Sequence, residues 1–422
     1  MIRGTTVHDV DIATNATPVE VTRAFEKAGK KVIPTGIKFG TVTVLMDGEP
    51  VEVTTYRKDG RYSDFRHPDE VSFSTSVEDD LERRDFTINA MAYDPVDGVL
   101  KDPHGGQNDL DKGIIRAVGN PDTRFLEDPL RMYRACRFNS KIAGSTIEPA
   151  TIASIRKNAP LAKKLSNERI RDEILKTLES DKPSTGLKCM ADGGLFDHVL
   201  PEIVDLKGVK QPVEYHSKDV FGHTLDVVDA IPPGKTTLRV AGLFHDIGKP
   251  STFKKTGEKI TFRGHDDAGA AMFPAIGERL KLTGADIDFV KGMIANHLIE
   301  YDDTWSDAAI RRLVNRAGKD RIDDLLTLNE ADYEKKAPGN ASVASKVRER
   351  IASMELSGAP ISFGIKDLKV TGKDVMAVLD IKPGPEVGRV LNRLLEAVIA
   401  DPSLNERKKL VELMGKKERL NA

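Results

Sequence analysis

Cysteine is almost absent from the sequence: Cys136 and Cys189 are the only two in 422 residues. Two cysteines within apolar helical segments build neither a disulfide framework nor a zinc site with cysteine ligands, so a reducing compartment is expected. No apolar run approaches the ~20 residues of a membrane span, and the residues after Met1 lack the apolar core of a signal peptide. The sequence predicts a cytoplasmic protein without a membrane partner.

The sequence also lacks a net charge of either sign. Its 64 lysines and arginines against 66 aspartates and glutamates leave a formal charge of −2. This balance neither supports nor excludes nucleic-acid binding, because an RNA site needs only a local basic surface. With 39% hydrophobic and 31% charged residues, the composition is that of a folded protein and not of a disordered chain. The length allows about two to four packed units.

The first hundred residues contain the pattern of short strands and turns. Alternating segments over 41–44 and 51–54 flank Asp47 and Gly48, which is typical of a β-hairpin. From about Arg124 the strand pattern stops and helical periodicity follows, interrupted by loops rich in proline and glycine. We therefore predict an α+β fold, in which a β-sheet head is followed by helical units.

Asp9 and Asp11 are two residues apart, which on a strand puts both carboxylates on one face. Glu52 alternates with valines on a later strand and is the candidate for a third carboxylate. Like charges held together need a cation, and oxygen ligands suit Mg²⁺. Three such carboxylates serve a two-metal site for phosphoryl transfer. The alternative is a solvated strand end before a helix cap at residues 15–18.

Three further segments are more specific. They are Arg83-Arg84-Asp85-Phe86-Thr87, Asp102-Pro103-His104-Gly105-Gly106, and Glu127-Asp128 followed by Arg131. Together they resemble the class II tRNA nucleotidyltransferases, which comprise the CCA-adding enzymes and related bacterial poly(A) polymerases. The resemblance extends almost to the C-terminus. It implies tRNA as the partner, CTP and ATP as substrates, and Asp9, Asp11 and Glu52 as the catalytic residues, with Mg²⁺ held by the aspartates.

Asp128, Arg131, Arg134 and Arg137 recur every three residues and form a slowly drifting stripe on a helix. A carboxylate accepts from an exocyclic amine while a guanidinium donates to a ring acceptor, so Asp128 and Arg131 fit cytosine or adenine and reject guanine and uracil. The resemblance implies this role for both residues, and nucleotide contacts for Arg84, Arg134 and Arg137. The alternative is an ordinary surface salt bridge between Asp128 and Arg131.

Residues 56–68 are polar, aromatic and rich in turns, and they resemble the family's flexible loop, which is associated with the switch from C to A addition. The alternative is an ordinary surface loop. The family also carries a Gly-Gly-x-x-Arg turn upstream of the aspartate pair that helps to hold the triphosphate. This sequence starts at Met1, after that turn, so we expect a head that is N-terminally incomplete and lacks its first strand. Three explanations stay open: a start assigned too late, a piece supplied by another chain, or decayed nucleotidyl transfer.

Five of the nine histidines fall within residues 216–297. One of them, His245, adjoins Asp246 within an apolar segment. Burial of both side chains there is costly unless they pair or bind a metal. The ordered set resembles the HD phosphohydrolase superfamily. That resemblance implies a divalent ion on His223, His245, Asp246 and Asp332, with His265 and His297 available for a second ion or for phosphate. Mn²⁺, Ni²⁺, Co²⁺, Zn²⁺ and Mg²⁺ all accept such ligands. The alternative is a set of hydrogen-bonded core histidines.

These resemblances divide the chain into four predicted domains: a nucleotidyltransferase head (1–112), a helical nucleotide-recognition neck and body (113–205), an HD domain (206–345), and a helical C-terminal body and tail (346–422). The implied function is template-independent CCA addition together with HD phosphohydrolase activity. One alternative is an enzyme that adds only A, only CC, or poly(A). Another is an HD phosphodiesterase or phosphatase with an inactive nucleotidyltransferase remnant, and a third is a non-catalytic RNA-binding protein. The oligomeric state is not readable.

Overall fold

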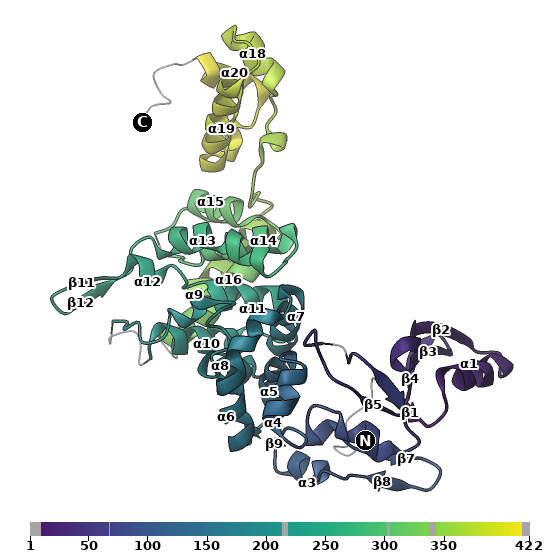
Figure 1. Ribbon diagram of the computed structural model, residues 1–422. Helices are drawn as coiled ribbons and strands as arrows, with labels where there is room; N and C mark the ends of the chain where they lie inside the picture. Colours follow the sequence, from purple (N-terminus) through teal and green to yellow (C-terminus); the bar gives the residue numbers. More distant parts are fainter. Residues whose placement is uncertain (1–9, 67, 213–217, 302–303, 337–342, 416–422) are drawn as a thin grey trace. The chain divides into compact units, whose positions relative to one another are not determined.

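A computed structural model describes the protein over residues 10–66, 68–212, 218–301, 304–336 and 343–415. Two compact units divide the chain. They comprise Met1–Val204 with Arg279–Lys281, and Asp205–Glu278 with Leu282–Ala422. Strands gather in the N-terminal part of the first unit, and helices follow (Figure 1). The predicted α+β fold is therefore confirmed.

The N-terminal sheet has four strands in the order β1-β4-β3-β2. β1 (Asp11–Thr14) runs parallel to β4 (Glu49–Thr55), and β3 (Thr41–Met46) lies antiparallel between β4 and β2 (Lys31–Gly36). Helix α1 (Pro18–Lys27) contacts β2, β3 and β4. The core of this layer consists of valines from the helix and two strands: Val21, Val42, Val44 and Val53.

Local sequence signals set the turns of this sheet. The predicted hairpin is confirmed: β3 and β4 are joined at Asp47 and Gly48, whose φ angles are 52° and 95°. Two positive φ values are those of a type I′ turn, which matches the twist of paired strands. The helix cap expected near residues 15–18 is also present, because Thr17 and Glu20 form a capping box at α1.

Small elements follow the sheet. They are η1 (Ile37–Phe39, between β2 and β3), β5 (Arg57–Asp59), β6 (Val71–Phe73), α2 (Val77–Glu82), η2 (Thr87–Asn89), β7 (Ala92–Asp94), β8 (Val99–Lys101), α3 (Gly106–Asp111) and β9 (Ile114–Ile115). β5 pairs antiparallel with β6. The loop expected over residues 56–68 therefore begins inside a short hairpin.

Helices complete the first unit. They are α4 (Pro121–Glu127), α5 (Leu130–Lys141), α6 (Pro149–Asn158), α7 (Asn167–Leu178), α8 (Pro183–Asp192) and α9 (Pro201–Val204), with β10 (Thr146–Ile147) and η3 (Ala159–Lys164) between them. α5 packs on α7 and α8 with Met132 and Tyr133 fully buried. The Tyr133 hydroxyl donates to the carbonyl of Leu195 at 2.7 Å. Because this face is buried, the predicted arginine stripe lies on the partly exposed side of α5.

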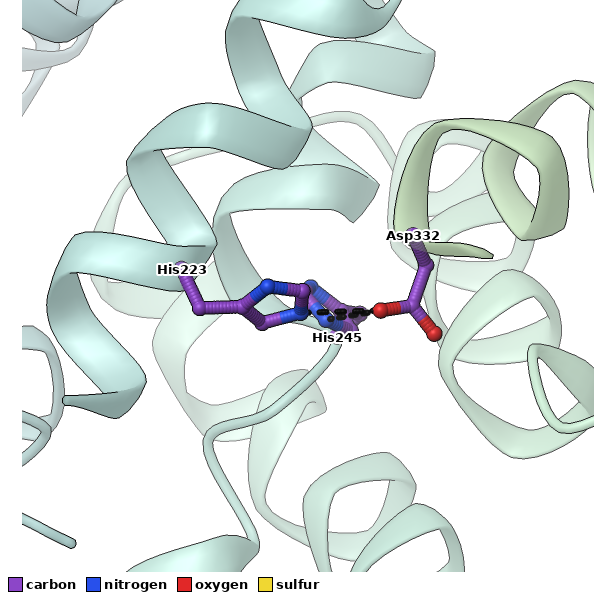
Figure 2. Close-up of side chains that lie close together, drawn as sticks. All are labelled: His223, His245 and Asp332. Carbon is purple, nitrogen blue, oxygen red and sulfur yellow. Dashed lines mark hydrogen bonds and ion pairs between the residues drawn. The ribbon is translucent and has the colours of Figure 1, made fainter. Parts of the chain in front are cut away.

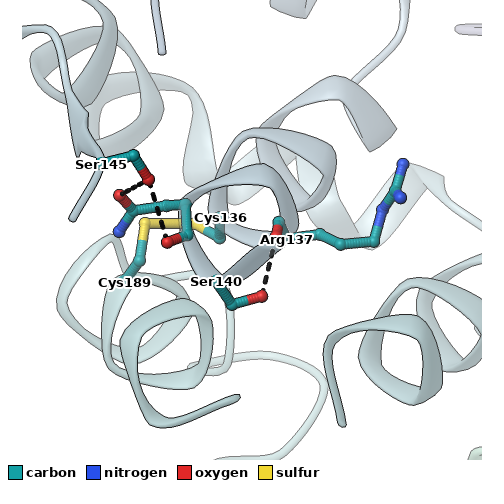
Figure 3. Close-up of a disulfide and its surroundings, with 6 residues drawn as sticks. Cys136, Arg137, Ser140, Ser145 and Cys189 are labelled. Atoms are coloured by element: carbon teal, nitrogen blue, oxygen red, sulfur yellow. Dashed lines mark hydrogen bonds between the residues drawn. A yellow bond between two sulfur atoms is a disulfide. The ribbon is translucent and has the colours of Figure 1, made fainter. Parts of the chain in front are cut away.

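A disulfide joins Cys136 of α5 to Cys189 of α8 (Figure 3). One bridge is not a disulfide framework, so that exclusion stands, but the pairing itself was not predicted. The sequence gives no sign of the pairing because the two positions are 53 residues apart. The packing of α5 on α8 brings their Cα atoms to 5.5 Å, within the range of a disulfide.

The second unit begins with a helical bundle. Its helices are α10 (Val220–Ala230), α11 (Thr236–Phe244), α12 (Lys249–Thr252), α13 (His265–Arg279), α14 (Gly284–Asn296), α15 (Asp307–Ala317), α16 (Ile322–Lys336) and α17 (Val343–Leu356). Between α12 and α13 lies an antiparallel hairpin of β11 (Lys254–Thr256) and β12 (Lys259–Thr261). The expectation that strands end near Arg124 is wrong here and at β10, because strands of two or three residues are too short to leave a pattern.

The C-terminal helices have a core of their own. The elements are η4 (Ile365–Asp367), α18 (Gly372–Leu379), α19 (Pro385–Ala400), η5 (Pro402–Leu404) and α20 (Arg407–Gly415). Their buried side chains include Val375, Leu394 and Leu410. Arg311 of α15 donates to the carbonyl of Ile399 at 3.0 Å and so ties this core to the bundle. Within the described ranges, no helix has the length and apolar character needed to cross a membrane.

Candidate functional site

Asp11 and Glu52, two of the three predicted catalytic carboxylates, lie opposite each other in the sheet. β1 and β4 pair in parallel with Asp11 in register with Glu52. Residues in register point to the same face of a sheet, and both of these are exposed. Asp9 lies outside the described residues, so its place in this set stays a prediction.

An open cleft of about 570 Å³ in the first unit includes Asp11 in its lining. Four of the five predicted nucleotide-binding residues line it: Arg84, Asp128, Arg131 and Arg134. The other lining residues are Arg83, Asp85, Asn89, Leu130, Phe138 and Arg169. A cleft of this volume with convergent polar groups is of the size that binds small molecules, and its cations suit a phosphate-bearing one.

Asp128 and Arg131 are each held by a different partner. Asp128 lies between α4 and α5, and its two carboxylate oxygens accept from Arg169 Nη2 at 2.8 Å and from the backbone N–H of Leu130 at 3.0 Å. Arg131 donates to Glu127 Oε2 at 2.7 Å and to the carbonyl of Arg83 at 3.2 Å. No ion pair between Asp128 and Arg131 occurs among the described residues, so the alternative of a surface salt bridge is wrong.

Arg134 is anchored by Asp85, whose Oδ2 accepts from Arg134 Nε at 2.7 Å. Burial acts to raise the pKa of Asp85, but the Arg134 guanidinium and Asn89 together hold that pKa below its ordinary value. Arg84 donates to Asp80 at 3.3 Å and to the carbonyl of Asn89 at 3.4 Å. Both arginines are thus oriented by the protein while they line the cleft.

Arg137 differs from the other predicted nucleotide contacts. Its Nε donates to Glu173 Oε2 at 2.7 Å, and its guanidinium lies 4.5 Å from the ring centroid of Phe138. Glu173 is buried in α7, and Arg137 is not among the residues that line the cleft. The structure therefore gives Arg137 an ion-pair role between α5 and α7, and its nucleotide contact stays a prediction.

Sequence reasoning did not assign Asp85, Glu127 and Arg169 to the site. The first two stand inside the quoted motifs, next to assigned residues, so their position was a usable signal. Arg169 is 41 residues from Asp128, and nothing in its neighbourhood marks it. Only the packing of α7 against α5 brings it to the cleft.

The predicted His–Asp set forms a second site, in the second unit, and every member is buried. His223 comes from α10, His245 and Asp246 follow α11, and Asp332 comes from α16. His265 begins α13, and His297 directly follows α14. Figure 2 shows the imidazoles of His223 and His245 directed at the carboxylate of Asp332. We call these six residues the His–Asp centre.

Gly248 explains how the centre closes. A Cβ on this residue would overlap the carbonyl of His265 and approach the backbone of Gly269. Only glycine allows the loop after Asp246 to lie this close to the start of α13. The residue therefore brings the His245–Asp246 loop and His265 together.

The six side chains form two groups whose ligand atoms lie within 4.8 Å of one another. They are His223, His245 and Asp332, and Asp246, His265 and His297. Asp246 also approaches the first group, with its Oδ2 3.2 Å from His245 Nε2 and 3.9 Å from His223 Nε2. The predicted four-residue set is therefore brought together, and Asp246 lies between the two groups.

The imidazoles are oriented by backbone carbonyls. The Nδ1 atoms of His245, His265 and His297 lie 2.7, 2.9 and 2.7 Å from the carbonyls of Gly242, Phe262 and Ile294. In each case Nδ1–H donates to the carbonyl, which leaves a lone pair on Nε2. This is the arrangement that holds histidine ligands toward a metal.

Asp246 is the most strongly perturbed acid of the centre. Burial opposes its charge, but His245 and Lys249 outweigh burial and hold its pKa well below the ordinary value. Lys249 Nζ lies 2.7 Å from Asp246 Oδ2, yet neither carboxylate oxygen has an aligned hydrogen bond within the described residues. His245 Nε2 also has none there. Buried carboxylate oxygens and an imidazole nitrogen without an aligned hydrogen bond are what a bound cation would satisfy.

The histidines respond differently to burial. Burial lowers the pKa of His297 to about 3, with the charge of His245 acting in the same direction. Burial also lowers the pKa of His223 despite its contact with Asp332. For His245, burial is outweighed by the nearby carboxylates of Asp246 and Asp332, which raise its pKa. Neutral imidazoles such as those of His297 and His223 are the form that binds metals.

Four family models match the chain. They are described as "Poly A polymerase head domain" over residues 1–116, "Probable RNA and SrmB- binding site of polymerase A" over 144–206, "HD domain" over 213–336, and a second domain of tRNA nucleotidyltransferases over 293–414. The matches follow the same order as the sheet, the helical part and the His–Asp centre.

Curated relatives match over most of the chain. A CCA-adding enzyme of Levilactobacillus brevis is 33% identical over 97% of this chain and 89% of its own length. An A-adding tRNA nucleotidyltransferase of Deinococcus radiodurans is 36% identical over 78% of this chain and 77% of its own length. With CCA-adding enzymes of Lactobacillus johnsonii and Lactobacillus gasseri, 45% and 46% identical, the match spans only about half, 53%, of each relative.

Among solved structures, the Bacillus stearothermophilus CCA-adding enzyme in complex with CTP has a TM-score of 0.69 and 28% sequence identity to this chain. The match covers 99% of this chain and 90% of that one. Sequence and fold comparisons thus agree from end to end.

Proposed function

The chain belongs to the family of CCA-adding enzymes, and from this premise we propose that it adds C, C and A to the 3′ end of tRNA from CTP and ATP, with release of pyrophosphate. The observation that supports this most is the cleft in which Asp128 and Arg131 are held by separate partners. If Asp128 and Arg131 formed an ion pair with each other, their hydrogen-bonding groups would not be available to a base. Here each side chain is oriented by another partner, which a base can replace. A tRNA substrate would be met in the cytoplasm.

We propose that Asp128 and Arg131 select the base. The carboxylate accepts from the amine of cytosine or adenine, and the guanidinium donates to the ring nitrogen beside it. Guanine and uracil present a donor where these bases present an acceptor. Arg84 and Arg134, two of the arginines that line the same cleft, would hold the triphosphate.

The carboxylates of Asp11 and Glu52, with Asp9, would hold Mg²⁺. Their fit to the ion rests on an exposed, same-face set of oxygen donors, which is the chemistry that Mg²⁺ prefers. Bound there, Mg²⁺ activates a hydroxyl and neutralises the charge of a departing pyrophosphate. The protein residues contribute position: the parallel pairing of β1 with β4 fixes the two described carboxylates side by side.

For the His–Asp centre we propose a metal-dependent phosphohydrolase activity. His223, His245, Asp246 and Asp332 would hold one divalent ion, and His265 and His297 a second ion or a phosphate. The fit rests on the buried acceptor atoms of Asp246 and His245 and on the Nδ1 anchors. Mn²⁺, Ni²⁺, Co²⁺, Zn²⁺ and Mg²⁺ are all compatible with this donor set. A bound ion supplies an activated water at neutral pH.

The experiment for the first activity incubates the chain with Mg²⁺, labelled CTP or ATP, and a tRNA that ends before CCA. The wild type should extend the tRNA by C, C and A, read by sequencing the 3′ ends, and Asp11→Ala should abolish the extension. Asp97→Ala, an exposed aspartate outside the cleft, is the matched control. Products ending in A alone, in CC or in a poly(A) tract would replace CCA addition by that alternative.

The same assay on a chain extended upstream by a Gly-Gly-x-x-Arg turn measures what that turn contributes. Addition by the extended chain alone would make the turn essential to the reaction. If neither chain adds a nucleotide, nucleotidyl transfer is wrong and the phosphohydrolase becomes the working activity.

The second activity is measured on p-nitrophenyl phosphate and bis(p-nitrophenyl) phosphate with each divalent ion in turn. Asp246→Ala should abolish hydrolysis and leave nucleotide addition intact, and Asp11→Ala should do the reverse. If either change abolished both activities, the assignment of two separate sites would be wrong.

A further inference from the structure

The hairpin β11–β12 is a basic arm that neither proposed reaction uses. It is inserted between α12, which directly follows the His245–Asp246 loop, and α13, which begins with His265. Figure 1 shows the two strands extending away from the neighbouring helices. Gly257, with φ 61°, occupies the turn, and a side chain there would meet nothing within 4 Å. The arm therefore projects from the chain segment that joins two parts of the His–Asp centre.

The root of the arm is anchored to that centre. Phe253 and Phe262 flank the two strands, and their ring centroids are 5.8 Å apart. Lys249 Nζ, which pairs with Asp246, lies 5.3 Å from the centroid of Phe262. The carbonyl of Phe262 also accepts from His265 Nδ1 at 2.9 Å. Phe262 therefore connects the arm directly to His265, a member of the centre, and to Lys249, which pairs with Asp246.

The arm carries four cationic side chains and a single acid, in a protein whose formal charge is −2. The cations are Lys254, Lys255, Lys259 and Arg263, and all four are exposed. Within the described residues, none of them makes an ion pair. On a surface with equal numbers of positive and negative charges, exposed lysines normally have acidic neighbours. In the arm, Glu258 is the single acid.

The two faces of the arm differ. Lys254 pairs with Thr261 and Thr256 with Lys259, so one face carries two lysines and two threonines and no acid. The other face joins Lys255 and Ile260 to the aromatic root, where Phe253 is 41% exposed. Lys255 is thus the cation on the same face as the exposed ring, and Lys254 and Lys259 lie on the other face of the same short hairpin. A cationic arm with an exposed aromatic ring is the combination that binds single-stranded nucleic acid, through phosphates and through base stacking.

We propose that the β11–β12 arm binds the phosphate backbone of a single-stranded RNA segment, with a base stacked on Phe253, and so brings RNA to the His–Asp centre. An acidic peptide would use the lysines but would offer no base to stack on the aromatic ring at their root. The proposal rests on the proposed phosphohydrolase only for the role of the neighbouring centre. RNA binding by the arm is measurable without that activity.

The test uses the full chain and a fluorescein-labelled 12-nucleotide oligoadenylate, with binding followed by fluorescence anisotropy over a range of salt concentrations. The variant K254Q/K255Q/K259Q keeps side-chain length and removes three charges. It should bind at least tenfold more weakly, and the slope of log affinity against log salt should fall by about 2, as expected for three lost phosphate contacts to a single strand. Equal affinity and slope would overturn the proposal.

The matched control removes three exposed lysines elsewhere in the second unit, in the variant K210Q/K291Q/K319Q. It should bind as the wild type does. An equal loss in both triple variants would mean that overall charge and not the arm governs binding. A poly-glutamate peptide that binds as tightly as the oligonucleotide, with the same loss in the arm variant, would assign the arm to acidic proteins instead.

Phe253→Leu separates stacking from charge, because leucine keeps an apolar side chain against Phe262. It should weaken binding of the oligoadenylate roughly tenfold and leave binding of an abasic oligonucleotide unchanged. Equal losses on both probes would show that the ring acts only through folding and would overturn its stacking role. Hydrolysis of p-nitrophenyl phosphate by each variant is recorded in parallel, so that a missing phosphohydrolase is distinguished from a missing RNA contact.

Discussion

The cleft and the His–Asp centre hold their charges in opposite ways. In the cleft, acids and arginines form pairs that stay partly open to water, as with Asp128 and Arg169, whose side chains are 17% and 20% exposed. In the His–Asp centre, two acids, four histidines and Lys249 share a space where the most exposed side chain, that of His265, reaches only 9%. The first site surrounds its charges with partners, and the second surrounds them with apolar core.

This difference separates two kinds of binding. An ion pair open to water contributes only about 0–1 kcal/mol, so a ligand can replace one of its partners at small cost. A buried charge cannot be left alone, and the unmatched acceptors of Asp246 favour a resident cation. Under the proposed function, the cleft would exchange its nucleotide at each step, and the centre would keep its ion through many turnovers.

The largest effect that we predict is the loss of stability when an acid of the His–Asp centre is replaced, compared with an acid of the cleft. Asp246→Asn removes a buried carboxylate and leaves the Lys249 ammonium, among the described residues, with a neutral hydrogen-bond partner, Gln211, and the ring of Phe262. We expect the metal-free second unit to lose about 3–5 kcal/mol of unfolding free energy. Asp128→Asn, in the cleft, should cost about 1 kcal/mol or less.

Urea unfolding of metal-free protein, followed separately for the two units, measures both values. Divalent ions should stabilise the wild type and leave Asp246→Asn unchanged. Similar losses of unfolding free energy for the two variants would mean that a buried charge in the His–Asp centre costs no more to leave unpaired than a charge in the cleft.

The disulfide tests whether the cleft is stabilised independently of the centre. Reduction of the Cys136–Cys189 bridge frees a loop of 53 residues in the unfolded state. We expect it to lower the stability of the first unit by about 2–4 kcal/mol. Calorimetry with and without dithiothreitol measures the shift, and Cys136→Ser should remove the response. A shift in the second unit's transition instead would contradict the independence of the two sites.

Base selection is the functional counterpart in the cleft. Asp128→Asn replaces a carboxylate, which only accepts hydrogen bonds, by an amide, which also donates. The variant should therefore bind uracil in place of cytosine more readily than the wild type does. We expect kcat/KM for CTP to fall about 10- to 100-fold, equivalent to ~1–3 kcal/mol, and the preference for CTP over UTP to shrink. Asp122→Asn, outside the cleft lining, is the control. An unchanged CTP/UTP ratio would remove Asp128 from base recognition.

Local signals were enough for much of this structure. The turn at Asp47 and Gly48 is encoded in two adjacent residues, and the alternation around it fixed which strands pair. Alternation and the resemblance led to the expectation that Glu52 joins Asp11, whereas the parallel pairing of β1 with β4 was not predicted. His245 and Asp246 were recognised as candidate site residues from the sequence, because two adjacent polar residues in an apolar segment require a partner when they are buried.

What the sequence did not reveal depends on tertiary packing. Cys136 meets Cys189, and Arg137 meets Glu173, only because α5 lies against α8 and α7. Contacts between distant residues leave no periodic pattern in the sequence from which they could be predicted. The arm at residues 254–261 was missed for another reason: its strands, Lys-Lys-Thr and Lys-Ile-Thr, are only three residues long and lack the apolar face by which a strand is recognised.

The smallest predicted effect concerns Asp85, an acid of the cleft that is buried like the acids of the centre but is paired with Arg134. Its pKa is lower in the folded protein than in the unfolded chain, because the Arg134 guanidinium outweighs burial. Its contribution to stability is therefore complete above the unfolded carboxyl pKa of about 4 and is lost as pH falls through the lower folded value. Asp85→Asn should destabilise the first unit at neutral pH, and the difference from wild type should shrink below pH ~4. Urea unfolding between pH 2.5 and 7 measures this, with the exposed Asp111→Asn as control. A difference that stayed constant with pH would mean that Asp85 acts by packing and hydrogen bonding alone, and that pairing in the cleft does not depend on its charge.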